Sequence, residues 1–236
     1  MSVSIDTVYQ RVLSILNKEQ RGYVTPQEFN LFANQAQMDI FEQYFYDLSQ
    51  FNRLPTDGNV NADIPALIEE KISLFEKTGT AAFNGTYHQL PSDLYRLNNV
   101  FMRSYISQDI YDITEVELVS PQYFLQLNKS DLTAPSSKWP IYIQSGKKIE
   151  IFPQSISQSA SLYYIKKPAK VEWKYQIVFG EALYDSTYSV DFELHESEET
   201  ELVIKILELA GVLVKDLSVY QIANGEEQEA IQQEKA

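Results

Sequence analysis

The stretch that decides the fold class is WPIYIQSGKKIEIFPQSISQSASLYYIK, residues 139–166. Its apolar residues come in short runs bounded by turn residues, a pattern typical of β-strands. Ser145-Gly146-Lys147 separates the first two runs and predicts a hairpin turn between them. The Ser-rich residues 155–161 would allow a further hairpin. The predicted strands are Trp139–Gln144, Lys148–Phe152 and Ser161–Lys166.

The residues before this stretch extend the β-rich middle of the chain. Strands are predicted at Leu97–Ile106 and Tyr111–Leu118, and Ser120-Pro121 is expected to begin a short helix. The glycine-bounded residues 79–85 are predicted as a loop, and residues 65–77 as a short helix with its apolar side inward. The middle of the chain is therefore mainly β.

Both ends of the chain are predicted to be helical. Apolar residues recur every three or four positions from Ile5 to Leu16, the stripe of an amphipathic helix. Thr25-Pro26-Gln27-Glu28 combines an N-cap, a first-turn proline and a capping box, so a second helix begins there and runs to about Phe51. A last helix is expected after Ser197, which would be its N-cap.

These patterns predict an α+β fold: a helical bundle built from both chain ends, with a central β-rich insertion lobe. Residues 1–80 would form the N-terminal helical part and residues 81–195 the β-rich lobe with its short helix. Residues 196–236 would form the C-terminal helix and tail, packing back on the N-terminal helices.

Composition excludes several classes of function. The 236 residues carry a net charge of −14, which argues against a free-standing nucleic-acid binder, since such proteins are normally basic. The absence of cysteine excludes disulfides and thiolate chemistry. No signal-peptide pattern opens the chain, and no apolar run approaches the roughly 18 residues of a membrane span. We therefore expect a soluble, unsecreted protein without a membrane partner.

Charge is segregated along the chain. Residues 138–174 contain seven Lys and two Glu, a net of +5, whereas residues 191–236 contain twelve acidic residues and three Lys, a net of −9. These are either two solvated faces or complementary surfaces that meet between copies of the chain. The polar tail 225–236 is either frayed or ordered on a neighbouring subunit. The candidate assembly residues are Lys147, Lys148, Lys166, Lys167, Glu226, Glu227 and Ile231.

Residues 17–28 have the spacing of a degenerate EF-hand loop, with Gly22 at position six and Glu28 at position twelve. Arg21 falls at a ligand position, where its charge would repel calcium. The simpler interpretation is a helix–turn–helix corner closed by Gly22 and the capping box. An adaptor that binds through this helix pair remains the alternative function.

No catalytic, cofactor-binding or metal-binding residue is predicted, and no cofactor is expected. His88 and His195 are interpreted as a strand-edge residue and a residue of an acidic run before a helix. Acidic pairs such as Glu198/Glu199 are interpreted as solvated helix ends. A hydrolase with scattered Asp and Glu metal ligands is the third, enzymatic hypothesis.

Three parts of the chain resemble the head–tail connector ring (adaptor) proteins of short-tailed, crAss-like phages and the tail tubular protein A group. They are VLSILNKEQRGYVTPQEFNLFANQAQMDIFEQYF near the start, LPSDLYRLNNVF with PIYIQSGKKIEIFPQ and ASLYYIKKPAKVEW in the middle, and FELHESEETELVIKILELAGVLVKDLSVYQ near the end. The resemblance implies a non-enzymatic virion protein made in the host cytoplasm. It implies a homo-oligomeric ring, commonly of twelve copies, stacked on the portal beside other tail proteins around the channel for double-stranded DNA.

Overall fold

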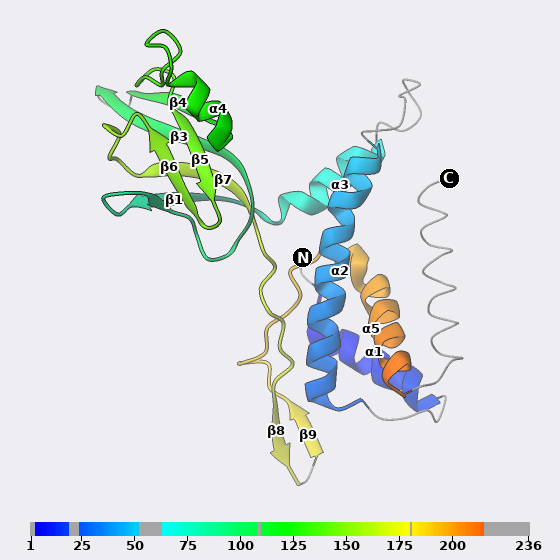
Figure 1. The fold of residues 1–236 in the computed structure, drawn as a ribbon. Helices are drawn as coiled ribbons and strands as arrows, with labels where there is room; N and C mark the ends of the chain where they lie inside the picture. The colour runs from blue at the N-terminus through cyan, green and yellow to red at the C-terminus, as the bar shows by residue number, and fades with distance from the viewer. Residues whose placement is uncertain (1–2, 19–23, 52–62, 108–109, 180, 215–236) are drawn as a thin grey trace. The chain divides into compact units, whose positions relative to one another are not determined.

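The structure is a computed structural model that describes residues 3–18, 24–51, 63–107, 110–179 and 181–214. The chain divides into two compact units (Figure 1). A β unit comprises residues 75–167, and a helical unit comprises residues 1–74 and 168–236. These limits differ from the predicted 1–80, 81–195 and 196–236, because residues 168–195 belong to the helical unit.

The β unit is a closed barrel with strand order β1-β2-β6-β5-β4-β3-β7. Neighbouring strands are antiparallel except β4 and β5, which pair in parallel through Glu117 and Ile141. The short helix α4, Pro121–Leu127, begins as predicted at the N-cap Ser120. The strands are β1 Glu76–Phe83, β2 His88–Gln89, β3 Leu94–Ser107, β4 Ile110–Leu118, β5 Ile141–Ser145, β6 Lys148–Phe152 and β7 Ala160–Lys166.

One continuous apolar cluster fills the barrel, because alternate residues of each strand point inward. Leu162 and Ile149 are fully buried at its centre. The predicted Ser145-Gly146-Lys147 turn is confirmed, since β5 and β6 pair from Ile141↔Phe152 to Ser145↔Lys148. The other buried members of the cluster are Ala81, Leu90, Val100, Met102, Val116, Tyr142, Ile151, Ala160 and Tyr164.

The structure corrects two local predictions in this unit. The loop predicted over residues 79–85 is wrong, because β1 runs through Gly79 to Phe83. A Cβ at Gly79 would lie 2.8 Å from Cε1 of Tyr164, so this glycine makes room for a ring and not for a turn. The further hairpin at residues 155–161 is also wrong, because β7 pairs with β1 and β3 and not with β6.

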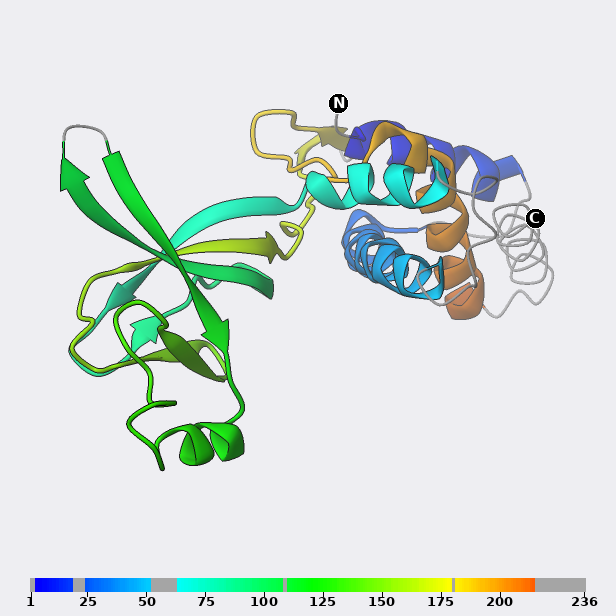
Figure 2. The ribbon, with the colours of Figure 1, turned by 90° about the horizontal axis from the view of Figure 1, so that it is seen from above.

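The helical unit contains α1 Ile5–Lys18, α2 Pro26–Phe51, α3 Asp63–Ser73, the 3₁₀ turn η1 Glu196–Glu198 and α5 Glu199–Val214. Helix α5 packs against both α1 and α2 (Figure 2). Val8, Phe29 and Leu202, one from each of these helices, are fully buried. The capping box is confirmed: Glu28 N donates to Thr25 Oγ1 at 3.3 Å, and Thr25 N donates to Glu28 Oε2 at 2.9 Å. A two-stranded sheet, β8 Tyr175–Val178 with β9 Glu181–Tyr184, completes this unit.

An amide clamp on α2 holds the returning chain to this unit. Asn30 exchanges two hydrogen bonds with the backbone of Trp173, and Asn34 does the same with Val171, at 2.7–3.2 Å. Gln37 donates to Ala169 O at 2.8 Å and accepts from Glu193 N at 3.1 Å. These three side chains satisfy backbone groups that no neighbouring strand reaches, so residues 169–173 are fixed along α2.

The predicted fold class, a helical bundle with a central β-rich insertion lobe, is wrong. The described strands include seven that close into a barrel with a core of its own, and the described helices number five. An open lobe would leave strand edges with unpaired backbone groups, whereas the pairing of β7 with β1 removes those edges. The closed barrel was not predicted from the sequence because the residues of β1 and β2 were not predicted as strands.

Candidate functional site

The four candidate lysines of the β unit lie around the turn that leads into β3. Lys147 and Lys148 are exposed at the β5–β6 turn; Lys147 Nζ donates to Ser92 O at 3.2 Å. The Lys148 ammonium lies 4.2 Å from the centroid of the Tyr87 ring, a cation–π contact. At the end of β7, the Lys167 backbone N–H donates to Asp93 O at 2.7 Å. Lys166 precedes it and donates its backbone N–H to Phe75 O.

Asp93 makes two side-chain hydrogen bonds that tie this turn to its neighbours. Its carboxylate accepts from Lys77 Nζ at 2.9 Å and from the Tyr164 hydroxyl at 3.1 Å. The hydrogen bond from Lys77 is the main cause that lowers the pKa of Asp93, and the same bond raises the pKa of Lys77. Burial, followed by the bond to Asp93, raises the pKa of Tyr164. The Lys77–Asp93 ion pair is half exposed. Through Lys77 and Tyr164, Asp93 links the turn to β1 and β7, so these contacts hold the turn in place.

The acidic charge belongs to one unit. Residues 75–167 contain nine basic and eight acidic residues, a net charge of +1. Because the whole chain carries a net charge of −14, the rest of the chain carries −15. The basic stretch and the acidic stretch seen in the sequence thus fall mostly in different units. Glu226, Glu227 and Ile231 lie outside the described residues.

The degenerate calcium loop falls partly outside the described residues, which omit 19–23. Within the described part, Glu28 is engaged by Thr25, whose side-chain and backbone hydrogen bonds lower the pKa of the Glu28 carboxyl. No group of three or more His, Cys, Asp or Glu residues that could hold a metal ion occurs among the described residues. Across the same residues, no helix is long and apolar enough to span a membrane.

Both histidines have structural roles. His88 is buried in β2, where its Nε2 lies 3.0 Å from Gln158 O. Ser197, predicted as the N-cap of the last helix, instead lies inside η1, which precedes α5. His195 is the N-cap of η1, since its Nδ1 accepts from Ser197 N at 3.2 Å. The interpretation of Glu198 as a solvated helix end is wrong. Its carboxylate is buried and lies 2.6 Å from Lys71 Nζ, which neutralises it.

Large apolar side chains are solvent-exposed in both units. In the β unit, α4 has no buried residue, and four large apolar side chains in α4 and in the segment that follows it are exposed: Tyr123, Leu125, Leu132 and Trp139. In the helical unit, the β8–β9 hairpin exposes Ile177, Phe179 and Leu183. Phe179 has a φ of 51°, a left-handed conformation that is uncommon for a bulky residue. Ile177 pairs with Ala182 and Leu183 with Gln176, so Ile177 and Leu183 lie on opposite faces of the hairpin.

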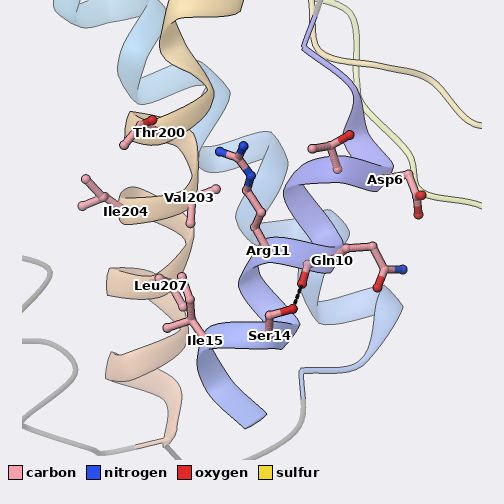
Figure 3. Close-up of a pocket in the computed structure, with 10 residues that line it drawn as sticks. Asp6, Gln10, Arg11, Ser14, Ile15, Thr200, Val203, Ile204 and Leu207 are labelled. Carbon is pink, nitrogen blue, oxygen red and sulfur yellow. Dashed lines mark hydrogen bonds between the residues drawn. The ribbon is translucent and has the colours of Figure 1, made fainter. Parts of the chain in front are cut away.

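A groove of about 670 Å³ runs between α1 and α5 (Figure 3). Ile15 and Leu207 provide apolar walls, and Arg11 lies at the rim, where its Nη1 is 3.0 Å from Glu199 Oε1. Ser14 turns its hydroxyl back to Gln10 O at 2.7 Å. The full lining is Asp6, Thr7, Gln10, Arg11, Ser14, Ile15, Thr200, Val203, Ile204 and Leu207.

The β8–β9 hairpin and the amide clamp were not predicted from the sequence. The run Tyr175–Val178 followed by Phe179-Gly180 is a strand-and-turn signal, yet it is only four residues long. Asn30, Asn34 and Gln37 are spaced by four and three residues on one helix face, a polar stripe that indicates a partner.

No protein-family model matches this chain, and no curated protein sequence matches it either.

Proposed function

We propose that this chain is a non-enzymatic structural subunit of a phage head–tail connector ring. In this proposal the ring, of twelve copies, is stacked on the portal and touches other tail proteins in the virion. It forms part of the channel through which double-stranded DNA is ejected, and the chain is made in the host cytoplasm. The resemblance to ring proteins of short-tailed phages suggests this assembly.

The observation that supports assembly best is the exposed apolar surface on both units. Leu132 is 94% exposed, Trp139 79% and Phe179 104%. Fully burying a leucine or phenylalanine side chain in a contact contributes roughly 1.5–3 kcal/mol, from which the entropy lost on association is subtracted. Exposed apolar side chains in both units suit a subunit in which each unit contacts a neighbour.

The charge distribution supports passage of DNA without binding. A helical unit with a net charge of −15 repels phosphates when its surface faces a channel. The near-neutral barrel, with its exposed Lys147 and Lys148, is then available for contacts with other proteins.

Two measurements test the proposal: mass spectrometry of purified phage particles that encode the chain, and negative-stain electron microscopy of the purified protein at high concentration. We expect the chain in particles at a constant ratio to the portal protein, and closed rings with a central opening. A Leu132→Glu/Trp139→Glu variant should enter particles less than wild type, whereas Lys129→Glu is the matched surface control. Absence of the chain from purified particles would refute the proposed function.

A further inference from the structure

The β8–β9 hairpin ends in side chains that its own fold does not use. Ile177 is 74% exposed and Leu183 62%, on a sheet of two strands whose outer edges are not paired with a third strand in the described part of the chain. Phe179, fully exposed at the turn, holds a left-handed backbone conformation that Asn or Gly adopts with less strain. Asn or Gly would make this turn with less strain, so phenylalanine at this position points to a role in a contact and not in folding.

The base of the β8–β9 hairpin is held by contacts with the rest of the helical unit. Trp173 stacks on Tyr175 and on Tyr184, with ring centroids 5.7 Å apart in each case. The Trp173 indole N–H donates to Asp6 Oδ1 at 2.9 Å, and its backbone is held by Asn30 of the amide clamp. A pre-ordered arm loses little conformational entropy when its tip binds.

The groove between α1 and α5 has the size and chemistry to receive such a tip. Its volume of about 670 Å³ lies within the roughly 300–1,000 Å³ of sites that bury apolar ligands. Ile15 is 42% exposed in its wall although it is a large apolar residue. The high exposure of Phe179 shows that the tip does not occupy the groove of its own chain.

Charge decides what kind of occupant fits. The helical unit is strongly acidic, so most of its surface repels the same surface of another copy. Residues 175–184 contain one charged residue, Glu181, which makes the hairpin the part of this unit that can approach another copy with least repulsion.

We infer that the hairpin tip around Phe179 inserts into the α1–α5 groove of a second copy of this chain. The inference rests on the proposed ring for its choice of a second copy. Tip and groove are different surfaces of one chain, so the contact is head-to-tail. Such a contact closes into a ring when a whole number of the rotations between neighbouring copies adds up to one full turn, without a shift along the axis.

Three variants of the full-length chain test this contact by analytical ultracentrifugation. Phe179→Asn removes the apolar tip while keeping a residue that tolerates the left-handed turn. Ile15→Glu places a charge in the groove. Leu31→Glu, at a 71% exposed position of α2 outside the groove, is the matched control. We expect the first two to weaken self-association at least about tenfold, as loss of a central apolar anchor does, and the control to leave it unchanged.

Mixing provides the decisive result. Phe179→Asn retains an intact groove and Ile15→Glu an intact tip, so an equimolar mixture should form dimers that grow no further. Phe179→Asn should also keep or raise the melting temperature, which a purely structural role for Phe179 would not allow. Wild type that stays monomeric, variants that assemble like wild type, or a mixture without dimers would overturn the inference. The chain's presence in phage particles would still stand, so failure of this contact is distinct from failure of the proposed function.

Discussion

The barrel and the helical unit hold themselves together by different means. In the barrel, one continuous stretch of chain closes around a single apolar cluster, and each strand pairs with two neighbours. The helical unit joins segments from opposite ends of the chain, and the amide clamp of Asn30, Asn34 and Gln37 bridges 132–156 residues of sequence. The barrel is thus held by one apolar cluster and by strand pairing, whereas the helical unit also depends on a few directional side-chain hydrogen bonds.

The largest expected effect is a core cavity confined to one unit. Leu162→Ala in the barrel and Leu202→Ala in α5 remove the same atoms from two fully buried positions, and each should cost about 2–5 kcal/mol of unfolding free energy. Hydrogen exchange should rise within residues 75–167 for the first and in the helical unit for the second. If either variant destabilised both units equally, the chain would unfold as one cooperative body and the comparison would fail.

A smaller effect should follow from breaking the clamp. Asn34→Ala leaves the N–H and C=O of Val171 without partners, and each unsatisfied buried group costs about 1–3 kcal/mol. Gln43→Ala is the matched control, because Gln43 donates to Asp47, one turn along the same helix, and not to the returning chain at residues 169–173. Chemical denaturation should show a clear loss for Asn34→Ala and almost none for the control. Equal losses would mean that helix propensity, and not the clamp, is being measured.

The N-caps of the two units allow a third comparison. Thr25→Ala removes the cap of α2, a helix whose Phe29, Ile40 and Phe41 are buried, and should cost roughly 0.5–2 kcal/mol. Ser120→Ala removes the equivalent cap of α4, which has no fully buried residue, so global stability should barely change. An unchanged denaturant midpoint for Thr25→Ala would show that the start of α2 is held by packing alone.

The sequence allowed the locally encoded parts of this structure to be predicted. The β5–β6 turn and the Thr25 capping box each depend on a few consecutive residues whose chemistry permits few alternatives. The barrel's closure could not be predicted, because Gly79 resembles a turn residue and its actual role, making room for Tyr164, depends on a strand 83 residues away. The hairpin tip and the groove also escaped prediction, since surface exposure of Phe179 or Ile15 is a property of the folded chain.

The smallest expected effects come from one carboxylate in each unit, and they differ in their response to salt. Asp93 in the barrel faces a cation, Lys77, whereas Asp185 beside β9 accepts hydrogen bonds from the neutral groups Gln176 and Thr187. Both pKa values are lowered. A lowered folded-state pKa means that each carboxylate stabilises the fold above its unfolded pKa near 4. That contribution is lost as pH falls through the folded-state pKa.

Asp93→Asn should therefore destabilise the protein at neutral pH by less than about 1 kcal/mol, because the ion pair with Lys77 is solvent-screened. The deficit relative to wild type should begin to shrink as the pH falls below about 4 and should vanish below the lowered folded-state pKa of Asp93, where the wild-type carboxyl is protonated as well. The pKa values of Lys77 and Tyr164 are raised, so these two groups affect stability at the alkaline end of the pH range. Their contribution to the free energy of unfolding is fully present below about pH 10 and is lost as the pH rises through their folded-state pKa values. Salt at about 1 M should reduce the neutral-pH deficit of Asp93→Asn, since the Debye length is then about 3 Å, but leave that of Asp185→Asn unchanged. Thermal denaturation at low and high salt measures both, and an Asp93→Asn deficit insensitive to salt would show that Asp93 acts through Tyr164 and not through the charge of Lys77.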